Sequence, residues 1–132
     1  MARQIFVNLP VRELERSKAF FGRLGFSFNP QFSDEKAACL VIEENSIYAM
    51  LLTEPYFKTF ITKAVCDATK STEVLVCLSC ESKEEVDALV AKAAASGGKA
   101  AREPKDHGFM YEHAFEDPDG HIWELMHMRS QS

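Results

Sequence analysis

One carboxylate, Glu124, stands in an otherwise apolar row near the end of the chain and is the residue best placed to do chemistry. Residues 121–128 alternate as a β-strand does, so Glu124 shares one face with Ile122, Met126 and Met128. A charge in such a row needs an ion-pair partner, a metal, water or a proton. We therefore expect the function to depend on what faces Glu124, with Met126 beside it as a ligand contact.

A second carboxylate, Glu112, lies on the preceding arm of the same predicted hairpin. The turn between the arms is the tetrapeptide of residues 117–120, Asp-Pro-Asp-Gly, whose residues favour a tight turn. If Glu112 faces Glu124 in one apolar site, the pair would share a proton or supply a general base. The alternative is that Glu112 is solvated at the mouth of the site.

Three other side chains are candidate ligand contacts. Asn8, on the first predicted strand, either hydrogen-bonds a ligand or makes a structural bond to a neighbouring turn. His107 precedes a glycine at a strand entrance, where it gates or protonates a ligand or is simply solvated. Cys77 would need a cationic neighbour to lower its pKa, and none is near it in sequence. Cys77 and Cys80 should point to opposite faces of a strand, so neither zinc nor a disulfide is expected there.

The composition and charge of the chain limit the kinds of partner that the protein could bind. The chain has 132 residues, of which 46% are hydrophobic and 27% charged, with a formal net charge of −5. No basic run suits nucleic acid, no apolar run could span a bilayer, and the start does not resemble a signal peptide. We expect a cytoplasmic protein that binds neither nucleic acid nor membrane.

The strands and helices that should position these residues form a repeated α+β pattern. The predicted order is strand, helix and three strands, followed by a connector and a second such set. The repeat spans 69 positions and aligns Leu9 with Leu78 and Phe20 with Leu89. The aromatic connector either lines a pocket or covers a core edge. The predicted strands are 3–11, 26–30, 37–43, 47–53, 73–80, 99–103, 109–116 and 121–128, with helices over 13–24 and from Ser82 to Gly97.

Two stretches, residues 9–26 and 115–125, resemble the vicinal oxygen chelate superfamily, which includes glyoxalase I, the fosfomycin and bleomycin resistance proteins and the extradiol dioxygenases. The second stretch contains the family's Asp-Pro-Asp-Gly turn followed by Glu124 and Leu125. The resemblance implies one domain over 1–132, made of module 1–53, connector 54–72 and module 73–132. It also implies that each βαβββ module curls into half of a cup, and that the chain forms a homodimer.

Each of the family's four metal-ligand positions can be matched to a residue of this chain. The last falls on Glu124, the first on Phe6, the second on or next to Leu51 and the third on or next to Leu75. Three apolar positions leave a divalent metal without the ligands it requires, so we expect no metal and no cofactor. A weak site for a hard cation, built from Glu124 with Glu112, Asn8 and water, is the remaining alternative.

We therefore predict a glyoxalase-like protein that binds a small organic ligand without the usual metal. The alternative is a lyase or dioxygenase with an atypical metal site around Glu124. Glu124 and Glu112 are the expected catalytic residues. The expected ligand contacts are Phe6, Asn8, Leu51, Leu75, Cys77, His107, Met110 and Met126.

Overall fold

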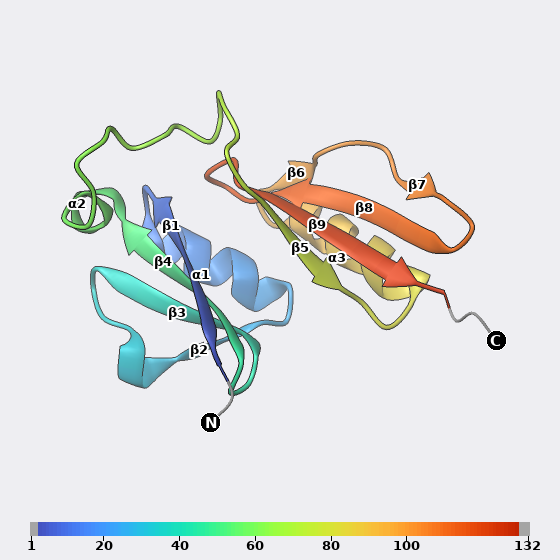
Figure 1. Ribbon diagram of the computed structural model, residues 1–132, viewed down its shortest axis with the longest axis horizontal. Coiled ribbons are helices and arrows are strands. Elements are labelled where there is room, and N and C mark those ends of the chain that lie inside the picture. Colours follow the sequence, from blue (N-terminus) through green and yellow to red (C-terminus); the bar gives the residue numbers. More distant parts are fainter. Residues whose placement is uncertain (1–2, 130–132) are drawn as a thin grey trace. The chain divides into compact units, whose positions relative to one another are not determined.

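The computed structural model describes residues 3–129, and the chain divides into two compact units between residues 66 and 67 (Figure 1). Each unit contains one sheet and one long helix. None of the helices in the described part is long and apolar enough to cross a membrane.

The first unit is a βαβββ module. Its sheet has the order β1-β4-β3-β2, in which β1 runs parallel to β4 and the other neighbours are antiparallel. The elements are β1 (Ile5–Val11), α1 (Leu14–Arg23), β2 (Ser27–Asn29), the 3-10 turn η1 (Pro30–Phe32), β3 (Ala37–Glu43), β4 (Ile47–Thr53) and the short helix α2 (Glu54–Lys58).

The second unit repeats this arrangement. Its sheet has the order β5-β9-β8-β6, with β5 parallel to β9, and β7 also pairs with β8. Its long helix begins after Ser82, whose side chain accepts a hydrogen bond from the backbone N–H of Glu85 as an N-cap. The elements are β5 (Leu75–Ser79), α3 (Lys83–Ala95), β6 (Lys99–Ala100), β7 (Lys105–Asp106), β8 (Met110–Glu116) and β9 (Ile122–Met128).

The predicted α+β fold with two βαβββ modules is confirmed, and the common strand order explains the repeat. One predicted strand is different, because only the first two residues of the run near 99–103 form a strand, β6, and a separate short strand, β7, follows it (Figure 1). Pro104 lies in the break and has no N–H to donate to a ladder. From Ala100 opposite Phe115 to Lys105 opposite Glu112, five steps on one side match three on the other, so two extra residues bulge out.

Each sheet buries one face under its helix. In the first unit, Leu9 and Leu51 are buried together with Phe20 and Phe21 of α1. In the second unit, α3 packs against β8 and β9, and the buried residues are Phe115, Trp123, Leu125, Val86, Val90 and Ala93. Side chains alternate along each strand, so the opposite face of each sheet carries most of the candidate site residues, Leu51 and the loop residue His107 excepted.

The turn between β8 and β9 has a structural role. Asp117 is buried, and its carboxylate accepts hydrogen bonds from the backbone N–H groups of Asp119 and His121 and from the indole N–H of Trp123. Burial is the main cause that raises the pKa of Asp117. Gly120 has a φ of +91°, and a Cβ there would lie 2.8 Å from the backbone of Ala68. These contacts hold the hairpin that positions both candidate carboxylates.

Candidate functional site

A guanidinium group joins the two candidate carboxylates. Arg102 Nη2 lies 3.2 Å from Glu124 Oε2 and 3.4 Å from Glu112 Oε1. The three side chains are only 24–30% exposed, so they form a largely desolvated cluster. We call Arg102, Glu112 and Glu124 the acid–arginine cluster. It supplies the partner that a charge in an apolar row requires.

Sequence reasoning missed Arg102, and simple strand pairing would have placed it on the wrong face. Continuing the β6–β8 register would set Arg102 opposite His113, whose neighbours Tyr111 and Phe115 are buried on the helix side. Arg102 lies between β6 and β7, in neither strand, so regular alternation does not apply to it and its side chain reaches both carboxylates. Pro104, directly after the predicted strand 99–103, was the available signal, because a proline cannot donate to a ladder and indicates a strand end, an edge or a bulge.

Cys77 lies directly opposite Glu124 in the β5–β9 ladder. Burial raises the pKa of its thiol, Glu124 and Glu112 raise it further, and Arg102 opposes them. The structure thus supplies the cation that the sequence lacked, but the two carboxylates outweigh it. The raised pKa makes the Cys77 thiol a poorer nucleophile than an ordinary cysteine.

Other predicted contacts share this face of the second sheet. His107 Nε2 lies 3.5 Å from Glu112 Oε1, so this loop histidine is next to the cluster. Leu75 is exposed in the same row as Cys77, while Met110 and Met126 are half-buried in the rows of Glu112 and Glu124. The second unit thus brings together seven of the ten predicted site residues.

The remaining three predicted residues lie in the first unit. Phe6 stacks on Tyr48 with ring centroids 4.8 Å apart, and Asn8 Nδ2 donates a hydrogen bond to the Phe6 carbonyl at 3.2 Å. Leu51 is fully buried on the helix side, whereas Met50 is paired with Asn8 and shares its face. The position predicted for Leu51 therefore moves by one residue to Met50, since a one-residue shift reverses the face.

A hydrogen-bond network on the helix side holds the loop that carries Arg102. His113 Nε2 lies 3.1 Å from the Arg102 carbonyl oxygen, which can only accept, so Nε2 carries the proton. Among the described residues, Nδ1 is buried without a hydrogen-bond partner, 3.7 Å from Asp87 Oδ1. Asp87 in turn pairs with Lys83 at 2.9 Å and accepts from the Tyr111 hydroxyl. His113 is thus a positioning residue for Arg102.

The donor set does not fit a divalent metal. Within residues 3–129, no three His, Cys, Asp or Glu side chains gather so that they could hold a metal ion. Glu124, the one family ligand position with a carboxylate, already faces a guanidinium at 3.2 Å. A metal there would have to displace Arg102 and would find an apolar Leu75 in the neighbouring strand.

Comparisons with known proteins found similarity over nearly the whole length of the chain. The family model described as the Glyoxalase/Bleomycin resistance protein/Dioxygenase superfamily matches residues 3–125. A hypothetical protein from S. aureus is similar in structure, with 29% identity, a TM-score of 0.78, and coverage of 96% of this chain and 94% of that one. No functionally curated protein matches the chain significantly.

Two solved structures with functional names share the fold at lower identity. The fosfomycin resistance protein FosX from Listeria monocytogenes is 19% identical, with a TM-score of 0.68 and coverage of 100% of this chain and 95% of that one. A bleomycin resistance determinant encoded on the transposon Tn5 is 20% identical, with a TM-score of 0.66 and coverage of 96% and 98%.

Proposed function

Because the chain belongs to the Glyoxalase/Bleomycin resistance protein/Dioxygenase superfamily, we propose that it binds a small organic molecule, without a divalent metal, beside its acid–arginine cluster. The observation that carries this proposal is the placement of Arg102 within 3.4 Å of both Glu112 and Glu124. A few convergent polar groups among apolar side chains are typical of small-molecule sites.

The surroundings of the cluster suit a ligand with an apolar body. Leu75 and Cys77 are exposed beside it, and Met110 and Met126 add flexible apolar contacts. Two carboxylates against one guanidinium leave the cluster with surplus negative charge. The complementary ligand therefore carries hydrogen-bond donors rather than an anionic group.

The metal-free character of the proposal follows from electrostatics. Arg102 already provides a positive charge where the family's metal would meet Glu124. A divalent cation would be repelled by this guanidinium and would gain few oxygen ligands. Zn²⁺, Ni²⁺ or Mn²⁺ at micromolar concentration should therefore leave the melting temperature unchanged, whereas saturation at a hundred times Kd would stabilise by about 2.7 kcal/mol.

The binding experiment uses the methionines as reporters. A library of small amines, alcohols and amides is screened by NMR against protein labelled with ¹³C at the methionine methyl groups. Binders should shift the signals of Met110 and Met126, and Glu124→Gln should abolish the shifts. Glu116→Gln is the matched control, since Glu116 lies on the same strand face but pairs with Lys99 instead.

Two results would overturn the proposal. One is a metal-dependent rise in melting temperature that Glu124→Gln removes, which would favour the lyase or dioxygenase with an atypical metal site. The other is a set of binders that shift the Met110 and Met126 signals equally in the unsubstituted protein and in the Glu124→Gln and Glu116→Gln variants.

We further propose that the chain forms a homodimer. Large apolar side chains are exposed on both units, including Ile5, Val74, Phe109 and Met128. Exposed apolar area of this kind commonly marks an interface between copies. Light scattering at micromolar concentration should give twice the 14.9 kDa chain mass, and a monomer would refute the proposal.

A further inference from the structure

The first unit contains a pocket of about 320 Å³. Asn8 is the one predicted site residue that lines it. Its floor is the sheet face that α1 does not cover, and its wall is built from η1, the loop after it and the region of α2. The lining residues are Asn8, Gln31, Phe32, Ser33, Asp34, Ala37, Met50, Leu52, Tyr56 and Phe60. The aromatic connector therefore lines a pocket, one of the two roles that its sequence allowed.

Aromatic rings dominate the wall of this pocket. Phe32 and Phe60 are 59% and 64% exposed, unusually open for phenylalanine. Tyr56 and Phe60 are arranged edge to face with ring centroids 5.1 Å apart. The Nζ atom of Lys36 lies 4.9 Å from the Tyr56 ring centroid, so this ring already attracts a cation.

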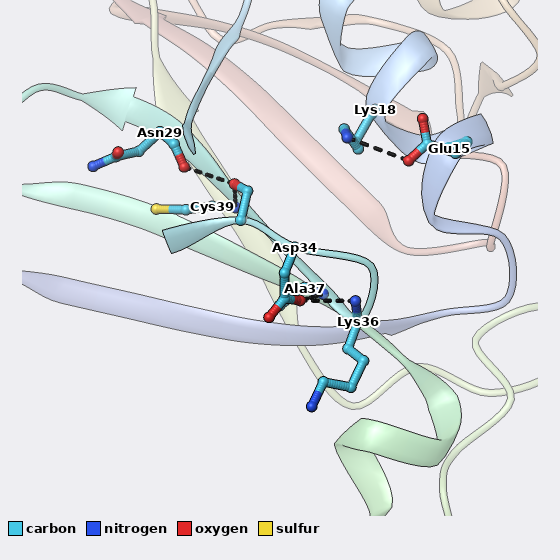
Figure 2. A network of polar contacts seen from close by, with 8 residues as sticks. Glu15, Lys18, Asn29, Asp34, Lys36, Ala37 and Cys39 are labelled. Carbon is cyan, nitrogen blue, oxygen red and sulfur yellow. Dashed lines mark hydrogen bonds and ion pairs between the residues drawn. The ribbon is translucent and has the colours of Figure 1, made fainter. Parts of the chain in front are cut away.

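Among the lining residues, Asp34 is the one acidic side chain. Its loop is held in place by its own hydrogen bonds (Figure 2). Asp34 Oδ1 accepts from the backbone N–H groups of Lys36 at 2.8 Å and Ala37 at 3.0 Å. Ser33 Oγ donates to the Asn29 carbonyl at 2.6 Å and accepts from the Cys39 N–H at 3.0 Å. The carboxylate is therefore positioned before any ligand arrives.

We propose that this pocket binds a small organic cation, a protonated amine with an aromatic or aliphatic body. The ammonium group pairs with the carboxylate of Asp34, and the apolar body lies between the rings of Tyr56 and Phe60 and the side chain of Met50. A carboxylate beside aromatic faces attracts cations through both charge and the ring quadrupole, and it repels anions. The volume is at the lower end for ligand pockets and suits a compact amine.

All of the residues that line this pocket belong to the first unit, between residues 8 and 60, whereas the acid–arginine cluster belongs to the second unit. The methionine methyl signals separate the two sites. Met50 lines the pocket, while Met110 and Met126 lie on the sheet face of the second unit. A ligand of the pocket should shift the Met50 signal.

The test compares three probes of similar size, namely 2-phenylethylammonium, the neutral 2-phenylethanol and the anionic phenylacetate. The cation should shift the Met50 signal with an affinity at least tenfold above that of either other probe. Asp34→Asn should weaken binding of the cation about tenfold while keeping the oxygen that accepts from Lys36 and Ala37. Glu35→Gln removes the same charge from the next residue, which does not line the pocket, and should change the affinity less than twofold.

The inference is overturned if the three probes bind equally, if none shifts the Met50 signal, or if Asp34→Asn and Glu35→Gln have the same effect. A second variant, Phe60→Ala, guards against a folding defect in the loop. Phe60 is exposed, so its truncation should leave the fold intact and still weaken cation binding several-fold.

Discussion

Replacing Arg102 by methionine should destabilise the second unit, because it leaves two carboxylates without their shared cation. At 3.2 and 3.4 Å, each contact corresponds to about 5 kcal/mol of Coulomb attraction at an effective dielectric constant of about 20. Desolvation of the three groups offsets most of this. Exposed pairs contribute about 1 kcal/mol or less, and loss of one partner from a buried pair costs about 3–5 kcal/mol. For side chains 24–30% exposed, we expect a loss of about 2–3 kcal/mol.

Urea denaturation followed by tryptophan fluorescence measures this loss. Trp123 is the single tryptophan of the chain and lies in the core of the second unit, so its emission reports on that unit. Adding Glu124→Gln to Arg102→Met should recover part of the loss, with a coupling free energy of about 1 kcal/mol or more. Lys99→Met is the control, since Lys99 is 71% exposed and 3.9 Å from Glu116, and should change stability little. A loss no larger than that of the control, or the absence of coupling, would refute the assignment of Arg102.

Three further outcomes are expected. Gly120→Ala should destabilise by about 2 kcal/mol or more in thermal or urea melts, because its φ of +91° is strained for alanine and the added Cβ meets backbone at 2.8 Å; an unchanged midpoint would contradict this. Glu124→Gln should speed alkylation of Cys77 by iodoacetamide several-fold at pH 8, measured by peptide mass spectrometry, because removal of a negative charge lowers the thiol pKa; an unchanged rate would mean that the carboxylate does not act on Cys77. Hydrogen bonds from Arg129 lower the pKa of Asp106 from 3.8 to about 2, so their stabilisation is present above pH 3.8 and lost as the pH falls through about 2. Asp106→Asn should flatten this part of the pH–stability curve, and equal slopes would argue against the pair.

The order and type of the elements follow from local patterns in the sequence. Alternation over residues 121–128 predicted β9, and Ser82 and the acidic residues after it predicted the start of α3. The turn at residues 117–120 was predicted from its residue types, since proline and glycine restrict or widen backbone conformation locally. These features depend on neighbours within a few positions, so the sequence alone determined the two βαβββ modules.

The composition of the candidate site depended on contacts between distant residues. Arg102 lies between β6 and β7 and from there reaches Glu112 and Glu124, whereas strand alternation continued from β6 predicts the opposite face. A one-residue difference in β4 exchanged Leu51 for Met50. Register is set by pairing across the sheet, and small shifts reverse every side chain, so a single strand does not specify it.

The same distinction explains the pocket of the first unit. The sequence left open whether the aromatic connector 54–72, which contains Tyr56 and Phe60, covers a core edge or lines a pocket. Only the tertiary structure placed them around the same space as Asp34 and Met50, which come from a loop and a strand far apart in sequence. The sequence thus determined which elements form, and the packing of those elements decided which side chains meet, because such meetings depend on geometry that no local pattern records.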